Sequence, residues 1–275
     1  MISEVAFLVM DLQDRQQSQL ANRFLNSYLE ITGDYAGLSV LPFYLTYRAM
    51  VRAKVNALRL EQKDISADER DQLRDAFESY LELATTYTQQ AQPQLIIMRG
   101  LSASGKSTVS QQLVDSIGAI RIRSDVERKR LFAYQPTENA ADEVDQGIYT
   151  SQVSQQTYSR LHDLSALIIS SGYSVIVDAA FLKHAQRAPF QILAENLAVS
   201  YSIMEITAPA EVLRQRITER AHDVSDANLT VLEHQLSNWQ PLLDSERTSV
   251  ITVNTAEPLD INKLIDKVNM RKNPS

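Results

Sequence analysis

The stretch LIIMRGLSASGKSTVSQQLV, residues 95–114, constrains the fold more than any other part of this 275-residue chain. It starts as a continuous apolar run, passes through two of only seven glycines, and continues with helical spacing. An apolar run that ends in glycine indicates a buried strand, and the periodicity behind it indicates a helix. The chain must therefore turn from a strand into a helix within residues 100–107.

The residues of this turn match the spacing G-x-x-x-x-G-K-[ST]. Glycine tolerates the backbone geometry with which such a loop wraps an anion, and the free N–H groups at the helix start converge on it. The lysine adds a charge for the β- and γ-phosphates, and the serine adds a hydroxyl ligand for Mg²⁺. The sequence therefore predicts a site for ATP and Mg²⁺. Its predicted cofactor-binding residues are Gly100, Ser102, Ala103, Ser104, Gly105, Lys106, Ser107 and Thr108.

The hydrophobic periodicity changes near Pro93. Before it the pattern is helical, and Ser66 with Glu69 forms a capping-box signature. Beyond it, short apolar runs alternate with amphipathic helices, which is typical of an α/β fold with a parallel sheet of about five strands. The expected strands are 95–98, 119–122, 174–177, 200–206 and 250–253. We expect an all-helical domain at residues 1–92 and an α/β domain at residues 93–275.

Two helical patterns are especially regular. One is an apolar series at three- to four-residue spacing in the first domain, formed by Phe43, Tyr47, Met50, Val51, Val55 and Leu58. The other is a single face in the second domain, which ends at Gly172 and is formed by Val153, Thr157, Leu161, Leu164 and Ile168.

Two carboxylates follow expected strands of the second domain. Open parallel sheets bind ligands beyond the carboxyl ends of their strands, so both are site candidates. Asp178 ends SVIVD and is predicted, with Ser107, to hold Mg²⁺; alternatively it is a hydrogen-bonding group of the loop. Asp125, in RIRSDVERKRLF, is predicted to position or deprotonate an acceptor hydroxyl, although Ser124 or Asp125 could equally be a helix N-cap.

Arginines supply further candidates. Arg216 and Arg220 share one helical face and could neutralise charge on a transferring phosphoryl group from a mobile lid, or simply lie on the surface. Arg123 and Arg128 flank Asp125 and could bind a phosphate or carboxylate of the acceptor. Alternatively, the basic run 128–130 is a solvated helix face.

Composition excludes some classes of protein. The absence of cysteine rules out disulfides and thiolate zinc sites, and the four histidines lack metal-ligand spacing. A net charge of -7 makes nucleic acid a minority hypothesis for the partner. The N-terminus does not have the pattern of a signal peptide, and no stretch has the roughly 20 apolar residues of a membrane span, so we expect a cytoplasmic protein with no membrane contact.

The α/β part resembles the P-loop small-molecule and polynucleotide kinases, a group related to zeta toxins and gluconate kinases. The resemblance rests on GLSASGKST, IRIRSDVERKRLF, VIVDAAF and LRQRITERAHDVSDA. It implies a parallel-sheet kinase domain with the active site described above. Arg187 falls where relatives carry an arginine after the third strand, so it either touches the acceptor or forms a salt bridge within its helix.

More closely, the whole chain is similar to the C-terminal part of a bacterial family in which an aminoglycoside-phosphotransferase-like protein is fused to a predicted P-loop kinase. The segments EVAFLVMDL, ANRFLNSYLEITGDY and VLPFYLTYRAMVRAKV carry this similarity. Nothing before EVAFLVMDL matches the His-Gly-Asp type loop or the metal-binding aspartate of that family. The resemblance therefore implies no phosphotransfer by residues 1–92, and Asp11 and Asp14 are not its catalytic carboxylates.

The leading hypothesis is an ATP-dependent kinase acting on a hydroxyl of a small molecule or a nucleic-acid 5' end. Its predicted catalytic residues are Lys106, Asp125, Arg216 and Arg220. A 5'-hydroxyl polynucleotide kinase would need a basic groove from Arg121, Arg123, Arg128 and Lys129, while the acidic segment 138–147 favours a small acceptor. The alternative is a nucleotide-binding regulatory module with slow or no hydrolysis. Neither the acceptor nor the oligomeric state follows from the sequence.

Overall fold

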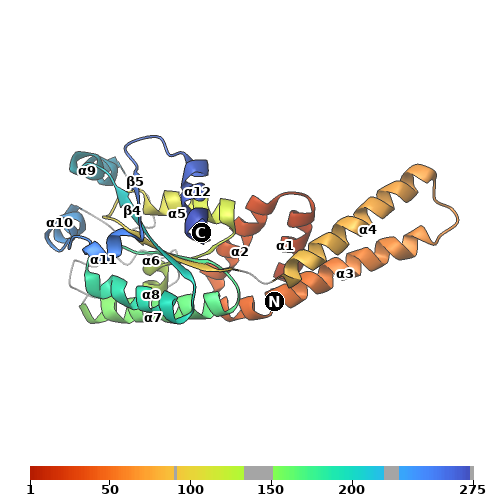
Figure 1. The fold of residues 1–275 in the computed structure, drawn as a ribbon, viewed down its shortest axis with the longest axis horizontal. Helices are drawn as coiled ribbons and strands as arrows, with labels where there is room; N and C mark the ends of the chain where they lie inside the picture. The colour runs from red at the N-terminus through yellow and green to blue at the C-terminus, as the bar shows by residue number, and fades with distance from the viewer. Residues whose placement is uncertain (90–91, 133–150, 220–228, 273–275) are drawn as a thin grey trace. The chain divides into compact units, whose positions relative to one another are not determined.

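The computed structural model describes residues 1–89, 92–132, 151–219 and 229–272 (Figure 1). The chain forms two compact units, Met1–Ala91 and Gln92–Ser275. The predicted lid residue Arg220 and the acidic segment 138–147 lie outside the described residues. Among the residues described, no helix is both long and apolar enough to cross a membrane.

The first unit is built from helices. Its elements are α1 (Ile2–Asp14), α2 (Ser18–Thr32), the 3-10 helix η1 (Tyr35–Ser39), α3 (Leu41–Leu60) and α4 (Ala67–Thr88). Gly33 ends α2 with a left-handed φ of 72°. The Ser66 hydroxyl caps α4 by accepting a hydrogen bond from the Glu69 amide at 3.2 Å, as the sequence predicted. Helices α3 and α4 form a long antiparallel hairpin (Figure 1).

The buried face of helix α3 is not the face formed by the large apolar residues from which the helix was predicted. Leu41, Leu45, Ala49 and Ala53 are buried at intervals of four residues, and α3 packs on α1 and α4. The two alanines allow close helix packing. The large apolar series that indicated the helix lies on another face and is exposed: Phe43, Tyr47, Met50, Val51, Val55 and Leu58. Periodicity identified the helix but not its buried face.

The second unit is a doubly wound α/β fold with a five-stranded parallel sheet of order β2-β3-β1-β4-β5. Its strands are β1 (Gln94–Arg99), β2 (Ile120–Arg123), β3 (Val175–Asp178), β4 (Ser200–Thr207) and β5 (Val250–Asn254). Its helices are α5 (Lys106–Ile117), α6 (Ser124–Leu131), α7 (Ser151–Ser170), α8 (His184–Asn196), α9 (Ala210–Glu219), α10 (Leu229–Ser237), α11 (Asp244–Arg247) and α12 (Ile261–Lys272). The predicted fold class is confirmed, and each strand lies within one residue of its predicted ends.

Helices cover both faces of the sheet (Figure 1). Ile96 and Met98 of the central strand point into the apolar core that α5 and α12 close, through residues such as Leu113 and Val268. Helices α7 and α8 pack on the opposite face. The face of α7 predicted from its period, Val153 to Ile168, is buried throughout, and Gly172 follows with a φ of 88°. Residues on both faces of β1 are therefore removed from water.

The strand register determines which residues meet at the carboxyl edge of the sheet. Asp178, the last residue of β3, is opposite Met98 of β1 on one side and Arg123 of β2 on the other. Residues 100–105 leave β1 beside it, and α6 leaves β2 on its other side. The predicted phosphate loop, Asp178 and Asp125 thus all follow neighbouring parallel strands.

Candidate active site at the carboxyl edge of the sheet

The loop between β1 and α5 has the tight backbone that its glycines predict. Gly105 has a φ of 92° and is the N-cap of α5. Ala103 also has a positive φ, of 61°, which is uncommon for a residue with a Cβ atom. These two conformations curve the chain so that the first amides of α5, and the positive end of its dipole, face the concave side of the loop.

Gly100 is required because its surroundings leave no room for a side chain. A Cβ atom there would lie 2.7 Å from the Ile206 carbonyl oxygen and 2.7 Å from Ser104 Oγ. Ser104 is itself almost completely buried, and among the described residues its hydroxyl has no hydrogen-bond partner. The backbone of Gly100, the first residue of the loop, therefore packs directly against the backbone of β4.

Ser107 and Asp178, the two predicted metal ligands, are in contact. Ser107 Oγ donates a hydrogen bond to Asp178 Oδ2 at 2.9 Å, and Ser110 Oγ approaches the same oxygen at 3.3 Å. Within the described residues no group of three or more His, Cys, Asp or Glu could hold a metal ion. A hydroxyl and a carboxylate fit Mg²⁺, because this ion keeps several waters and takes further oxygens from phosphates.

Protein groups occupy two hydrogen-bond donors of the loop, the Lys106 ammonium and the Ser102 amide. Lys106 Nζ donates to the carbonyl oxygens of Gly100 at 2.9 Å and Leu101 at 2.8 Å. The Ser102 amide donates to Gln235 Oε1 of α10 at 2.7 Å. An anion that enters the loop must therefore displace the Gln235 carboxamide. Gln235 was not predicted, because it lies 133 residues from Ser102 and no motif marks it.

Arg216, predicted as a lid residue, contacts the outer side of the loop. Its guanidinium donates to the Ala103 carbonyl at 3.3 Å, to Thr255 Oγ1 at 2.9 Å and to the Thr255 carbonyl at 2.7 Å. The Thr255 hydroxyl in turn donates to the Ser104 carbonyl at 2.7 Å. In this structure Arg216 therefore supports the loop backbone. Thr255, which follows β5, belongs to the same support and carries no recognisable sequence signal.

Asp125 lies in the first turn of α6, where it faces Arg128. The N-cap of this helix is Arg123, without a side-chain cap, so neither Ser124 nor Asp125 has the capping role that we considered. Asp125 Oδ1 is 3.3 Å from Arg128 Nη1, and its side chain is half-exposed. An exposed carboxylate held by an arginine can accept a hydrogen bond from an acceptor hydroxyl.

The run 128–130 is not a solvated helix face, which corrects one alternative. Lys129 is buried, and Arg130 pairs with the fully buried Glu127, which also contacts Arg160 at 3.3 Å. Arg121 is likewise engaged, with the Ser107 carbonyl and Ser110 Oγ, each at 3.3 Å. These basic residues are thus mostly internal supports and do not form an open basic groove.

A buried arginine immediately before the loop was not predicted. Arg99 lies opposite Glu205 of β4 in the sheet register and forms an ion pair with it. Its guanidinium also stacks on Trp239, 3.8 Å from the ring centroid, and donates to the Gln240 carbonyl at 2.6 Å. Burial lowers the pKa of Arg99 to about 10, which leaves it charged at neutral pH. Arg99 thereby fastens the segment after α10 to the strand that carries the loop.

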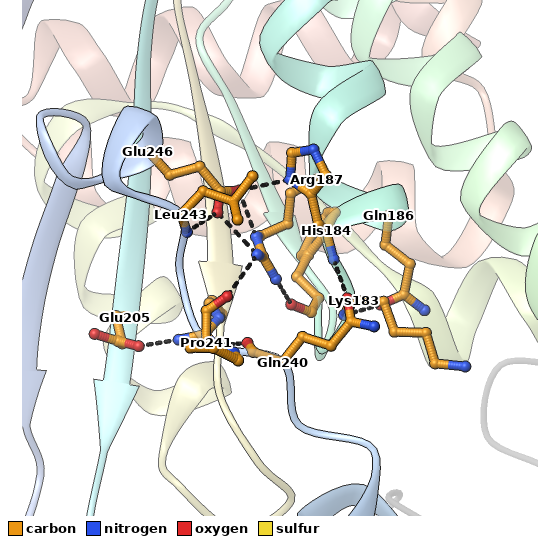
Figure 2. Close-up of polar contacts among 11 residues, drawn as sticks. Lys183, His184, Gln186, Arg187, Glu205, Gln240, Pro241, Leu243 and Glu246 are labelled. Atoms are coloured by element: carbon orange, nitrogen blue, oxygen red, sulfur yellow. Dashed lines mark hydrogen bonds and ion pairs between the residues drawn. The ribbon is translucent and has the colours of Figure 1, made fainter.

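Arg187 is buried in a second ion pair, so its predicted contact with the acceptor is not what the structure provides. Figure 2 shows its guanidinium bonded to both carboxylate oxygens of Glu246, at 2.7 and 2.9 Å. Its remaining donors reach the carbonyls of Phe181 at 3.1 Å and Pro241 at 3.4 Å. The pair links α8 to α11 and does not lie within one helix. The Arg187 side chain is fully buried and its guanidinium is engaged with Glu246 and two carbonyls, so it does not present itself to an acceptor.

Comparison with known proteins identifies the family. Residues 95–242, more than half of the chain, match the family AAA_33, described as an AAA domain. The chain belongs to the AAA_33 family. Two solved structures share the fold at a TM-score of 0.50: a sugar kinase from Janibacter sp. HTCC2649, 20% identical, and Kti12 from Chaetomium thermophilum in complex with ADP-AlF3, 15% identical. Each match covers 65% of this chain, and it covers 94% and 99% of those chains respectively.

Longer relatives occur in mycobacteria. The chain is 31% identical over 230 residues to uncharacterized proteins of Mycobacterium tuberculosis and Mycobacterium bovis. The alignment covers 84% of this chain and 45% of each relative, so the chain spans less than half the length of the curated relatives it matches. Because the second unit makes up about two thirds of the chain, the similarity extends into the first unit.

The variant Gly100→Ala tests the close approach of the Gly100 backbone to β4. We expect the added methyl group to clash with the Ile206 carbonyl, lower the free energy of unfolding by about 2 kcal/mol or more, and weaken nucleotide binding. Urea unfolding and calorimetric titration with Mg-ADP measure the two effects. Ser116→Ala, at the far end of α5, is the control and should change neither quantity. A Gly100→Ala variant as stable as the native chain would contradict the close approach.

The Arg187–Glu246 pair predicts a particular dependence of stability on pH. Burial raises the pKa of Glu246, but the hydrogen bonds from Arg187 and the Leu243 amide outweigh it and lower the pKa from 4.5 to about 2. A lowered folded-state pKa contributes stability that is complete above the unfolded value of 4.5 and is lost as pH falls toward 2. The shift corresponds to about 3 kcal/mol.

Glu246→Gln measures this contribution. Above pH 6 we expect the variant to lose about 3 kcal/mol or more of unfolding free energy, because Arg187 keeps a buried charge without its partner. The difference from the native chain should shrink as pH falls from 4.5 toward 2, because the unfolded native chain takes up a proton on Glu246 that the folded chain binds only near pH 2. Asp244→Asn, at an exposed neighbour, is the control. A difference that stays constant from pH 7 to 3 would contradict the assignment.

Proposed function

We propose that the second unit is an ATP-dependent kinase that transfers the γ-phosphoryl group to a hydroxyl of a small molecule. One observation carries the proposal: the 2.9 Å contact between Ser107 of the phosphate loop and Asp178 of β3, next to Lys106 and the start of α5. Phosphoryl transfer needs little beyond positioning and charge stabilisation, and these residues supply both. Membership of the AAA_33 family and a fold shared with kinases support it.

The phosphate loop would hold the β- and γ-phosphates of ATP. Its amides and the N-terminus of α5 would bind the phosphate oxygens, and Lys106 would move from the Gly100 and Leu101 carbonyls to the new anion. Ser107 and Asp178 would hold Mg²⁺. When bound, this ion neutralises charge on the β- and γ-phosphate oxygens. Arg216 would keep the outer side of the loop rigid through its carbonyl contacts.

Asp125 would accept a hydrogen bond from the acceptor hydroxyl, or its proton, and so direct the oxygen at the γ-phosphate. It follows β2, the neighbour of β3, and is the half-exposed carboxylate of α6 opposite Arg128. Arg128 would fix its orientation, while Arg123 is the candidate for a charged group of the acceptor. The nearby Tyr158 hydroxyl is not a base, because burial raises its pKa to about 12.

A small acceptor is favoured over a nucleic-acid end. A polynucleotide would need exposed cations along a groove, whereas Lys129 is buried and Arg121 bonds to α5. The Janibacter protein is a sugar kinase, which makes polyols the first acceptors to try. We place the reaction in the cytoplasm, where ATP and Mg²⁺ are available.

For the first unit we propose a structural role without phosphotransfer, as the tail of an aminoglycoside-phosphotransferase-like fold. Its two candidate carboxylates serve internal contacts. Asp11 pairs with Arg15 at 3.0 Å and Arg52 at 3.5 Å, and Asp14 accepts from Ser79 Oγ at 3.0 Å. Carboxylates in such contacts hold helices together.

A nucleotide-dependent switch is the second candidate function. It is favoured by the contact between Gln235 and the Ser102 amide, since a nucleotide must break it and thereby release α10. In a nucleotide-dependent switch, the release of α10 would itself be the functional response to nucleotide binding. No acceptor would be phosphorylated. The two functions differ in whether an added hydroxyl compound changes ATP turnover.

Two variants test the kinase proposal. Lys106→Ala should abolish ATP turnover with the fold intact, because the positive charge that the lysine places beside the γ-phosphate is lost. Asp125→Asn should still bind ATP but transfer about 100-fold more slowly, the usual effect of losing a general base. ATP consumption and product phosphorylation are measured with Mg²⁺ against sugars, nucleosides, aminoglycosides and 5'-hydroxyl oligonucleotides.

Asp163→Asn, an exposed carboxylate on α7, is the matched control and should retain full transfer. Normal turnover in Lys106→Ala would remove the phosphate-loop assignment. Unchanged transfer in Asp125→Asn would remove Asp125 from the acceptor site. ATP binding that no acceptor affects would favour the switch.

A further inference from the structure

Helix α3 carries a continuous apolar stripe that its own unit does not cover. The stripe consists of Val40, Phe43, Tyr47, Met50, Val51, Val55 and Leu58, each between 38% and 67% exposed. Its first four members follow the alternating three- and four-residue spacing of a coiled-coil seam. Lys54 is the one charged residue that the helical repeat places within it. A stripe of this spacing fits the surface of another helix.

The size of the stripe is that of a protein interface. Single exposed apolar residues are common on monomers, but seven on one helix face form an extended patch. From their exposed fractions, the seven side chains present on the order of 700 Å², close to the roughly 800 Å² that each partner contributes to a standard interface. Phe43 and Tyr47 stack with their centroids 6.4 Å apart, which gives the patch a rigid aromatic end.

An antiparallel pairing places four of the seven stripe residues opposite one another. In an antiparallel pairing of two α3 helices, with a two-fold axis between residues 50 and 51, Phe43 is opposite Leu58 of the second copy and Met50 is opposite Val51. The same register places Lys54 opposite Tyr47, so the single cation meets an aromatic ring with a hydroxyl. Phe43, Met50, Val51 and Leu58 thus meet apolar residues, whereas Val55 lies opposite Thr46 and Val40 opposite Glu61.

We propose that this stripe is the interface of a homodimer, formed by antiparallel pairing of α3 with α3 of a second copy. A two-fold interface uses the same surface on both partners, so the stripe of one copy can cover the stripe of the other. Four helices, α3 and α4 from each copy, would then share one core. The proposal does not depend on the kinase function, because no residue of the phosphate site takes part.

Sedimentation equilibrium of the full chain, from about 5 to 100 µM, measures the association in the range expected for an interface of this size. The native chain should be dimeric, and Val51→Glu, which places like charges beside the axis, should raise the dissociation constant at least about 30-fold. Ile31→Glu, at an exposed apolar residue of α2, is the matched control. Circular dichroism confirms that the variants fold.

Cysteine pairs test the register, since the chain contains no cysteine. A mixture of Phe43→Cys and Leu58→Cys chains should form a disulfide-linked heterodimer on mild oxidation, whereas Phe43→Cys alone should link much less. Preferential linkage of Phe43→Cys to itself would overturn the antiparallel arrangement. A native chain that stays monomeric, or a dimer that Val51→Glu leaves intact, would overturn the proposal. The stripe would then contact another partner, such as the region of the longer relatives that lies outside the aligned part.

Discussion

The central position of β1, paired in parallel with β3 and β4, is the constraint on which the proposed site depends. Parallel strands end at one edge, so a fixed register brings Asp178 and Glu205 level with the last residues of β1. Helices cover both faces of this strand, and all six of its residues are buried. A shift of one residue would exchange the side chains between its two packed faces and separate Ser107 from Asp178. Burial of the strand thus fixes the geometry of the polar edge.

Buried charges extend this control to distant segments. Arg99 and Arg187 are both almost fully buried, and each pairs with a carboxylate and donates to carbonyls of residues 240–241. Unpaired charges of this kind would be strongly destabilising, so the segment between α10 and α11 is held where its carbonyls complete the networks. Gln235, four residues before Trp239, consequently lies at the phosphate loop.

Much of the fold could be predicted because its strands are short apolar runs and its helices have clear periods. Local spacing marks the glycine-rich loop and Asp178 in the sequence, and the parallel topology brings Ser107 of this loop into contact with Asp178. Arg99 with Gln240 could not be found, because the two are 141 residues apart and polar pairing at such distance leaves no local pattern. For Arg187 the sequence left both an acceptor contact and a salt bridge open, because an arginine after a strand looks the same in sequence whether buried or free. The apolar series of α3 marked a helix, but the small buried alanines that form its inner face gave little signal.

Hydrogen exchange of the backbone amides at residues 100–108, with and without Mg²⁺ and a non-hydrolysable ATP analogue, tests the central claim most directly. If this loop holds the phosphates, the analogue should slow exchange there, while the amides of α10 exchange faster as Gln235 leaves Ser102. Exchange at residues 100–108 that is unchanged by a saturating analogue would contradict the account, because the amides would then not be the groups that bind the nucleotide.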